Sequence, residues 1–374
     1  MNMIGKKIGV GLIGANPDPA KSWGTRGHIP AINHLANFEL VGICTSTPDS
    51  ARAAAQHFAV PLAFSDPREM AAHRDIDVIV ISVRTELHRS MIEAAVAERK
   101  HVYCEWPLGV TTAEAAQSLH DAERAGVRTA IGLQGRYNDM LRYARDLIDD
   151  DAIGKVIAVT MDVQQENFGP VEAAAYAYTA DLVNGANLLS IGTAQALSGM
   201  CYVVGDFSEL SAVVACQYGE ARIRETNATI PKTSPDQVAI TGRLNNGAVV
   251  SVHMKGGATR TAGARLEING TKGDLLLRSS GGANIHRAIL SMAGGRGSKL
   301  DPMPLPDRYR LSPPGLESSP ATGVAHLYQD FAAAINGDAS MELDFSYAVR
   351  WHRLIDAIRR AADTGTRQVI ADDF

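Results

Sequence analysis

The sequence predicts an α/β fold in two domains: a doubly wound parallel sheet, then an α+β domain built on a large, mostly antiparallel, open-faced sheet. Up to about residue 133, apolar runs rich in Val and Ile alternate with segments of helical period. After about residue 150 the runs alternate apolar and polar residues by twos. Parallel sheets are usually buried on both faces, whereas antiparallel sheets often have one solvent-exposed face. We therefore place a first domain at residues 1–134 and a second at 135–374, whose final helix could return to the first.

The first domain contains five apolar runs that we expect to be strands. They are IGVGLIG (8–14), FELVGIC (38–44), DVIVISV (77–83), KHVYCE (100–105) and VRTAIGL (127–133). Between them lie four segments with apolar residues at helical spacing, which are 28–37, 49–58, 87–98 and 112–126. This alternation of strand and helix is typical of a sheet whose two faces are both covered by helices.

The second domain begins with a helix expected over residues 139–150. Six strands follow, at 156–165, 209–218, 236–244, 248–255, 264–270 and 273–278. The turns NNG (245–247) and NGTKG (269–273) favour hairpins. Residues 281–323 are rich in Gly, Pro and Ser and predict a long surface excursion, and helices near 324–336 and 344–364 close the chain. The open sheet face could form a subunit interface or could simply be solvated.

Composition excludes several classes of function. The 374 residues carry a net charge of -5 and no Lys/Arg-rich run, so we expect neither a nucleic-acid partner nor an anionic membrane surface. The four cysteines form no CxxC pair, and His, Cys, Asp and Glu show no metal-ligand spacing. Every apolar run is far shorter than the roughly 20 residues that cross a bilayer. We therefore expect a cytoplasmic protein without a bound metal.

A glycine turn after the first run is the candidate phosphate site. In a doubly wound sheet, a ligand binds where a Gly-rich turn leads into the next helix. Gly14 lies at this turn, but no strict GxGxxG follows. A longer loop instead runs from Asn16 past Trp23 and Gly24 to a helix expected near His28. A flexible connection without a ligand is the alternative.

The end of the second run should lie beside the adenosine ribose of a dinucleotide. NAD sites usually offer Asp or Glu there, whereas this chain offers Thr45, Ser46 and Thr47, with Arg52 a turn later. Hydroxyls and a cation suit a 2′-phosphate, so we expect NADP in preference to NAD. The same hydroxyls could instead cap the helix that opens at Asp49, and both roles can hold together.

Several motifs together resemble the Gfo/Idh/MocA oxidoreductase family (glucose-fructose oxidoreductase, inositol dehydrogenase) over nearly the whole chain. They are the glycine turn, HVYCEWPLG, AIGKV and INGTKGDLLL. Within that family the chain is most similar to the branch of the fungal galactose-regulon repressor, on WGTRGHIPAI, EWPLG, PKTSPDQ, LNNGAVV and HMKGG. The resemblance implies a Rossmann domain that binds NAD(P), and a second domain that binds substrate and forms homodimers or homotetramers through its sheet.

The resemblance also identifies departures from the family's proton relay. The wider family reads Glu-Lys-Pro where this chain has Glu105, Trp106 and Pro107, and an indole N–H can donate but cannot relay a proton. A cis Trp106-Pro107 bond is implied. Trp106 could stack on the nicotinamide or on a sugar, or could simply pack in the core. Ser190 and Ala194 or Gln195 stand where enzymes of the family place Asp and His.

Another group must then take the hydroxyl proton. We rank Lys255 first, because Gly256 and Gly257 would let a ligand or another backbone come close, and Tyr178 and His88 as weaker candidates. Arg84 and Glu86 follow the third apolar run, where they could bond the nucleotide or pair with each other. Gln134 and Arg136 follow the strand expected at 127–133, at the junction of the two domains, where they could contact a ligand or link the domains. The predicted site residues are, for catalysis, Lys255 and Tyr178; for the coenzyme, Gly14, Asn16, Trp23, Gly24, His28, Thr45, Ser46, Arg52, Arg84, Glu86, His88, Glu105, Trp106, Pro107 and Gln134; and for the substrate, Trp106, Arg136, Ser190 and Gln195.

Two functions compete at this point. We favour an NAD(P)-dependent oxidoreductase that acts on a carbohydrate-like substrate such as a sugar, cyclitol or related polyol, with net or transient oxidation. The alternative is a catalytically inactive, nucleotide-sensing regulator that binds a protein partner, similar to the galactose repressor. The missing lysine motivates this alternative, and fold alone does not decide between the two.

Overall fold

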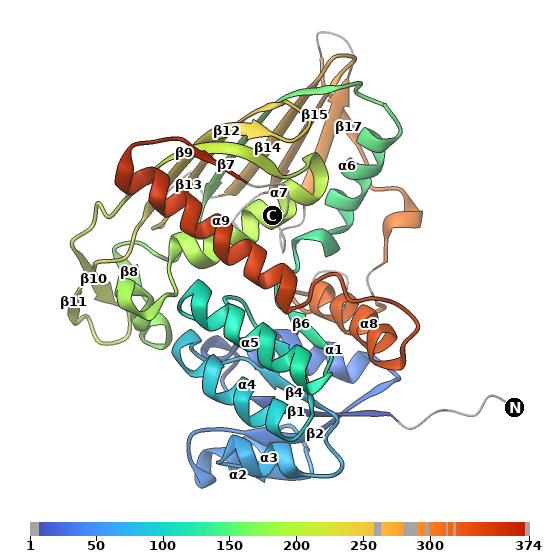
Figure 1. Cartoon of the computed structure of the whole chain (residues 1–374), viewed down its shortest axis with the longest axis vertical. Coiled ribbons are helices and arrows are strands. Elements are labelled where there is room, and N and C mark those ends of the chain that lie inside the picture. The colour runs from blue at the N-terminus through green and yellow to red at the C-terminus, as the bar shows by residue number, and fades with distance from the viewer. Residues whose placement is uncertain are drawn as a thin grey trace, which may run out of the picture. The chain divides into compact units, whose positions relative to one another are not determined.

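The computed structural model describes residues 7–257, 263–279, 290–295, 299–311, 313–316 and 319–370. The chain divides into two compact units (Figure 1). The first unit contains Met1–Gly132 and Ser312–Arg350, and the second contains Leu133–Leu311 and Trp351–Phe374. The segment 312–350 therefore clusters with the first unit, although our sequence boundaries assign it to the second domain.

A six-stranded parallel sheet forms the centre of the first unit, as the sequence predicts. Its strand order is β3-β2-β1-β4-β5-β6, and every neighbouring pair is parallel. The strands are β1 Ile8–Ile13, β2 Phe38–Cys44, β3 Leu62–Phe64, β4 Val78–Ile81, β5 His101–Cys104 and β6 Thr129–Ile131. All four residues of β4 are buried, which explains its unbroken Val/Ile composition. Only the short β3 was not expected.

The helices of the first unit are α1 Ile29–His34, α2 Pro48–His57, α3 Pro67–Ala72, α4 His88–Ala97, α5 Thr112–Ala125 and α8 Thr322–Asn336. Local chemistry sets their ends. Thr47 and Ser50 form a capping box at the start of α2, and Thr111 caps α5, which ends at the left-handed Gly126. Helix α8 packs against α1, although nearly 300 residues separate them along the chain. This contact brings a late segment into the first unit.

The second unit contains a nine-stranded sheet with the order β17-β16-β15-β14-β7-β13-β12-β9-β18. Neighbours pair antiparallel except β7 and β13, which are parallel. The strands are β7 Val156–Gln164, β9 Phe207–Ala215, β12 Gln237–Leu244, β13 Val249–Lys255, β14 Gly263–Gly270, β15 Asp274–Ser279, β16 Leu290–Gly295, β17 Asp301–Met303 and β18 Gln368–Val369. The two predicted hairpins join β12 to β13 and β14 to β15. This mixed, mostly antiparallel sheet confirms the predicted fold class.

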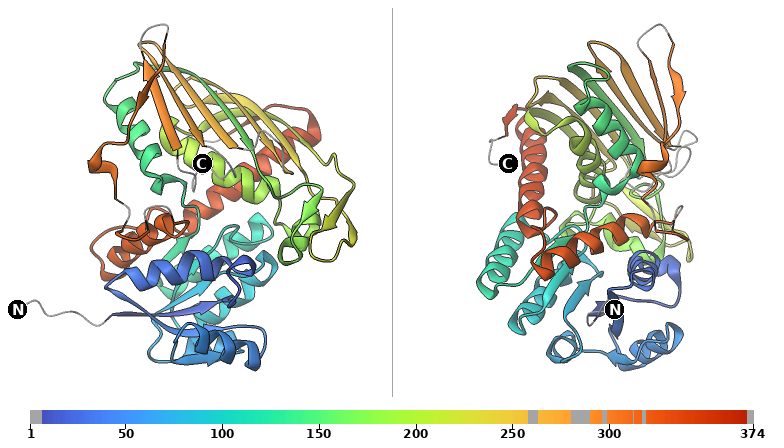
Figure 2. Two further views of the ribbon diagram at one scale, coloured as in Figure 1. Left: turned by 180° about the vertical axis from the view of Figure 1, so that it is seen from behind. Right: turned by 90° about the vertical axis from the view of Figure 1, so that its right-hand side faces the viewer.

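The helices of the second unit gather on one face of this sheet (Figure 2). They include α6 Asp139–Asp149 and α7 Ala194–Val204, which pack together, and the π-helical turn η7 Leu188–Thr193, which contacts β12 and β13. In β13, Val250, Val252 and Met254 are buried, whereas the alternate residues are more exposed. A smaller sheet is built from β8 Val171–Glu172, β10 Glu220–Ile223 and β11 Thr229–Pro231. Helix α9, Phe345–Thr364, links the two units in sequence.

The expected surface excursion at 281–323 is partly wrong. Where this stretch is described, β16 and β17 extend the large sheet, and α8 begins at Thr322. The short strands LSMAGG (β16) and DPM (β17) show too little apolar alternation to be recognised from sequence. The rest of the predicted excursion, at 281–289, 296–298, 312 and 317–318, lies outside the described residues. Within the described part of the chain, no helix is both long and apolar enough to cross a membrane.

Candidate functional site

The strand order of the first unit reverses between β1 and β4, which creates the switch point where such sheets bind ligands. Gly14 follows β1 at this edge with φ of +104°, a conformation that side chains rarely adopt. A Cβ at Gly14 would also overlap the backbone carbonyl oxygen of Ser82, which follows β4. Glycine is therefore required at this turn, where the sequence predicts the phosphate site.

The loop after Gly14 is tied down by its own side chains. Ser22 Oγ donates to Gly14 O at 2.6 Å, and Thr25 Oγ1 donates to Asn16 O at 2.7 Å. A π-helical turn, η2 Gly24–His28, leads directly into α1. The helical segment thus begins at Gly24, before the His28 that the sequence indicated. These bonds hold Asn16 and Gly24 at the switch point and argue against a loosely connecting loop.

The hydroxyls after β2 cap α2. Thr45 Oγ1 and Thr47 Oγ1 lie 2.6 and 2.8 Å from Ser50 Oγ, and α2 begins at Pro48, one residue before the expected Asp49. Arg52 forms an exposed ion pair with Asp49. The capping alternative is therefore present in the structure. Ser46 and Arg52 remain exposed and able to meet a ligand.

The peptide bond between Trp106 and Pro107 is cis, as the resemblance implied. This turn follows β5, the strand next to β4. Trp106 is 6% exposed and Glu105 is 8% exposed, so both side chains are largely enclosed. The turn presents only a small edge of each residue to a ligand.

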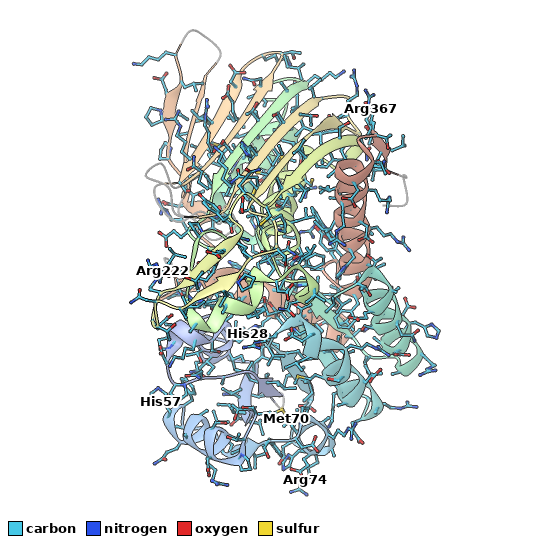
Figure 3. The ribbon with its side chains drawn as sticks, turned by 90° about the vertical axis from the view of Figure 1, so that its left-hand side faces the viewer. His28, His57, Met70, Arg74, Arg222 and Arg367 are labelled. Carbon is cyan, nitrogen blue, oxygen red and sulfur yellow. The ribbon has the colours of Figure 1, made fainter. Side chains whose placement is uncertain are left out.

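His28 forms a buried network with Glu105 and Tyr328. Its Nε2 lies 3.0 Å from Glu105 Oε1, and its Nδ1 lies 2.9 Å from the Tyr328 hydroxyl. His28, which is labelled in Figure 3, is fully buried. The imidazole therefore bonds to protein groups at both nitrogens, and contact of His28 with the coenzyme stays a prediction. Tyr328, on α8, was missed, because nothing in the sequence near residue 328 indicates a partner 300 residues away.

The buried ring of His88 contacts the backbone of the cis turn. Its Nδ1 lies 2.8 Å from the Pro107 carbonyl oxygen and its Nε2 lies 3.1 Å from that of Val83. Burial lowers its pKa, partly offset by these two carbonyls. His88 is 1% exposed, so its ring is placed to hold the turn, and its contact with the coenzyme stays a prediction. Arg84 and Glu86, by contrast, are exposed at the end of β4.

Lys255 lies at the end of β13, with its Nζ 2.6 Å from Asp162 Oδ2 on the adjacent β7. Both residues belong to the alternate set that points away from the buried core of the sheet. The glycines that follow have a packing role, because a Cβ at Gly256 would overlap Phe168 and one at Gly169 would overlap Gly257. Of the two predicted uses of these glycines, close approach of another backbone is the one observed.

Four predicted residues surround α7 in the second unit. Ser190 shares a capping box with Asn187 at the start of η7, and Gln195 is buried on α7 itself. Gln134 directly precedes the turn η4 Gly135–Tyr137, which contacts α7. The Arg136 guanidinium lies 5.2 Å from the ring of Tyr202, also on α7. Tyr178 belongs to the 3-10 segment Ala174–Ala180 of the same unit.

A buried charged cluster around β8 was not predicted. Glu172 is 2% exposed, and burial raises its pKa to about 7. Lys232 is also buried and donates to the carbonyl and hydroxyl oxygens of Ser234, each at 2.7 Å. Asp236 accepts from the backbone of Gln217 and Tyr218. The motif PKTSPDQ supplies both Lys232 and Asp236.

The described residues contain no cluster of three or more His, Cys, Asp or Glu side chains suited to a metal ion. The polar groups at the carboxyl edge of the first sheet include hydroxyls, amides, the Glu105 carboxylate and the charged side chains of Arg84 and Glu86. Such groups suit hydrogen bonding to an organic ligand.

Comparison with known proteins identifies both units. Residues 8–133 match the model of the oxidoreductase family with an NAD-binding Rossmann fold, and residues 140–279 match that of the Gal80p C-terminal domain. The galactose/lactose metabolism regulatory protein GAL80 of Kluyveromyces lactis is 27% identical over 320 residues, which cover 78% of this chain and 69% of that protein.

In sequence, a relative named as a dehydrogenase matches over a greater length than GAL80 does, whereas a solved Gal80p structure from Saccharomyces cerevisiae also covers 98% of this chain, with a TM-score of 0.86 at 23% identity. Dehydrogenase aclE of Aspergillus oryzae is 23% identical over 382 residues, covering 97% of this chain and 98% of that protein. The solved structure of levoglucosan dehydrogenase in complex with NADH and L-sorbose superposes with a TM-score of 0.83 at 21% identity, covering 98% of this chain and all of that one. This structural likeness establishes the shared fold.

Proposed function

The chain belongs to the Gfo/Idh/MocA oxidoreductase family and carries a Gal80p-like C-terminal domain, and from this premise we propose that it is an NAD(P)-dependent oxidoreductase acting on a CH–OH group. The substrate class is a sugar, cyclitol or related polyol. The observation that carries the proposal is the edge of the first sheet. There the Gly14 turn and the cis Trp106-Pro107 turn both follow central strands of a nucleotide-binding fold.

The neutral polar residues around α7 support a polyol substrate. Ser190, Gln195 and Gln134 are buried amides and hydroxyls, the groups that exchange hydrogen bonds with hydroxyl-rich ligands. None of them can take a proton at neutral pH. Trp106 would supply a flat apolar surface for the nicotinamide or a sugar ring. Relatives named as dehydrogenases, one of them solved with NADH and L-sorbose, agree with this class of reaction.

The proton of the substrate hydroxyl needs an acceptor other than Trp106. Of our two candidates, we now put Tyr178 ahead of Lys255. Asp162 already holds the Lys255 ammonium, and the adjacent glycines serve a backbone crossing. Tyr178 is partly exposed in a segment that the large sheet does not include.

The enzyme proposal is tested by measuring nicotinamide absorbance with a panel of polyols and aldoses. We expect reduction of the coenzyme with at least one compound, at a turnover on the order of 1 to 1000 per second. Isotope exchange at the carbinol carbon would detect a redox-neutral reaction in the same panel. Binding of the coenzyme without a signal in either assay would refute the proposal that the chain is an enzyme.

The preference for NADP over NAD is a finer proposal that rests on Ser46 and Arg52. We expect Arg52→Gln to weaken NADP+ binding by about tenfold in calorimetry, because one charge-assisted contact to the 2′-phosphate is lost. NAD+ binding should not change. Arg68→Gln, which removes an exposed arginine from α3, is the matched control. Equal loss of NAD+ and NADP+ would contradict a 2′-phosphate contact.

A coenzyme-sensing regulator is the second candidate, favoured by the likeness to GAL80 and by the absence of an acid or base at Ser190 and Gln195. It predicts tight coenzyme binding with no turnover in either assay above. We further propose a homodimer or homotetramer through the open face of the large sheet, which light scattering after size exclusion would test. A monomeric mass at micromolar concentration would overturn the proposal of a homo-oligomer.

A further inference from the structure

A row of three hydrogen-bonding side chains runs from the interior of the first unit to the cis turn. It begins at Tyr328 on α8, passes through His28 at the end of η2, and ends at Glu105 after β5. Tyr328 and His28 are completely buried, whereas the Glu105 side chain is 11% exposed. Only the last member of the row can reach a ligand.

The hydrogen bonds assign the protons. Burial, with the nearby charge of Glu105, raises the pKa of the Tyr328 hydroxyl well above its usual range, so this group keeps its hydrogen. Among the described residues, His28 Nδ1 is the partner of that hydroxyl, and Nδ1 therefore accepts. The proton of a neutral His28 then lies on Nε2, which donates to Glu105 Oε1.

The doubly protonated ring fits this geometry less well. It would carry a hydrogen on Nδ1 and leave the Tyr328 hydroxyl hydrogen buried without an acceptor, which is unfavourable. Tyr328 thus selects the neutral Nε2–H tautomer of His28. The Nε2–H of this tautomer points at the Glu105 side chain, whose Oε1 accepts the hydrogen bond.

Packing fixes the same arrangement. The ring of Tyr103 meets the His28 ring edge-on at 4.8 Å between centroids. A Cβ at Gly132 would lie only 2.5 Å from Glu105 Oε2, so the carboxylate is pressed against the end of β6. Each side chain in the row is held by a neighbour as well as by its hydrogen bond. This is the support that a precisely positioned binding group needs.

We propose that Tyr328 and His28 are positioning residues, which orient the Glu105 carboxylate to accept hydrogen bonds from hydroxyl groups of the bound nicotinamide coenzyme. The inference rests on the proposed function, because it needs the coenzyme at the carboxyl edge of β5. Glu105 is the binding group, and His28 and Tyr328 act only through it. No pattern in the sequence indicates that Tyr328 contacts His28, because Tyr328 belongs to α8, in the late segment 312–350 of the first unit.

The test compares His28→Leu with His28→Gln in the full chain by calorimetry with NAD+ and NADP+. A glutamine keeps an N–H donor that can reach Glu105, whereas leucine has none. We expect coenzyme affinity to fall about tenfold in His28→Leu and in Glu105→Gln, and by less than about threefold in His28→Gln. His57→Leu, at an exposed histidine of α2, is the control and should bind as the wild type does.

A spectroscopic readout separates positioning from general stability. With 15N-labelled histidine, His28 should give the signals of a neutral Nε2–H ring, assigned by their loss in His28→Gln. In Tyr328→Phe these signals should shift towards a mixture of tautomers, while circular dichroism reports an unchanged fold. Equal affinity loss in His28→Leu and His28→Gln, or a His28 ring that is protonated on Nδ1 in the wild type, would overturn the proposal.

Failure of the proposed function looks different. If the wild-type chain binds neither coenzyme, the function and this inference fall together. If the wild type binds while Glu105→Gln and His28→Leu bind within twofold of it, only the positioning role is refuted. Because Tyr328→Phe and His28→Gln are conservative, they keep the test informative even if His28→Leu does not fold.

Discussion

Replacing Glu172 with glutamine should stabilise the protein at alkaline pH and leave it unchanged in mild acid. Glu172 is 2% exposed, and burial raises its pKa from 4.5 to about 7. The backbone amides of Phe168 and Gly169 and the charge of Lys232 act in the opposite direction. Neither carboxylate oxygen makes a hydrogen bond of good geometry, so burial prevails. The folded chain therefore disfavours the charged carboxylate.

The pH dependence follows from proton linkage. Between 4.5 and about 7 the folded state holds more protons at Glu172 than the unfolded state does, so stability falls as pH rises through this window. A difference of about 2.5 pKa units at 1.36 kcal/mol each gives a loss of roughly 3 kcal/mol, complete above about pH 7. A neutral glutamine avoids this loss. The advantage of Glu172→Gln is then up to about 3 kcal/mol near pH 8 and close to zero near pH 4.5.

The assay is urea unfolding of the full chain near pH 5 and near pH 8, followed by circular dichroism. Only the difference between variant and wild type is compared, because other groups also titrate. Glu166→Gln removes an exposed carboxylate six residues away and should show no such difference. The reasoning is refuted if Glu172→Gln is equally or less stable relative to wild type at the higher pH than at the lower.

Three further outcomes follow from the same structure. Gly14→Ala should lower the free energy of unfolding by more than about 2 kcal/mol and weaken coenzyme binding in calorimetry, because the added Cβ would overlap Ser82. Gly126→Ala is the control: Gly126 also has a positive φ, +68°, but has open space around it, so this change should lower the free energy of unfolding by only about 1 kcal/mol. Lys255→Met should change the free energy of unfolding by less than about 1 kcal/mol, because its ion pair with Asp162 is partly exposed. It should also leave turnover within about threefold of wild type, whereas Tyr178→Phe should lower turnover about a hundredfold or more. The reverse pattern in steady-state kinetics would restore Lys255 as the proton acceptor. Thr47→Ala should cost about 1 kcal/mol in thermal or urea unfolding through loss of the α2 cap, and a Thr47→Ser variant as stable as wild type would confirm that the hydroxyl is responsible.

Local patterns in the sequence determined most of the fold. The buried Val/Ile runs of β1, β2 and β4 and the two-residue alternation of β12 and β13 separated a parallel sheet from an antiparallel one. The turn Asn245–Gly247 specified its hairpin, and its Gly247 adopts the left-handed φ of +88° that such turns favour. These features depend on neighbours a few residues apart, so the sequence alone carries them.

Tertiary structure decided which of the chemically plausible residues can meet a ligand. His28 and His88 look alike in sequence as free imidazoles, yet one is held between Tyr328 and Glu105 and the other between two backbone carbonyls. Gly256 and Gly257 lie against the backbone of Phe168 and Gly169, in the loop between β7 and β8, where a ligand was equally possible from sequence. The physical reason is that hydrophobic period and turn preference are short-range properties. Burial and partner choice depend instead on which distant segments the folded chain brings into contact, and residue 328 reaches residue 28 only through the packing of α8 against α1.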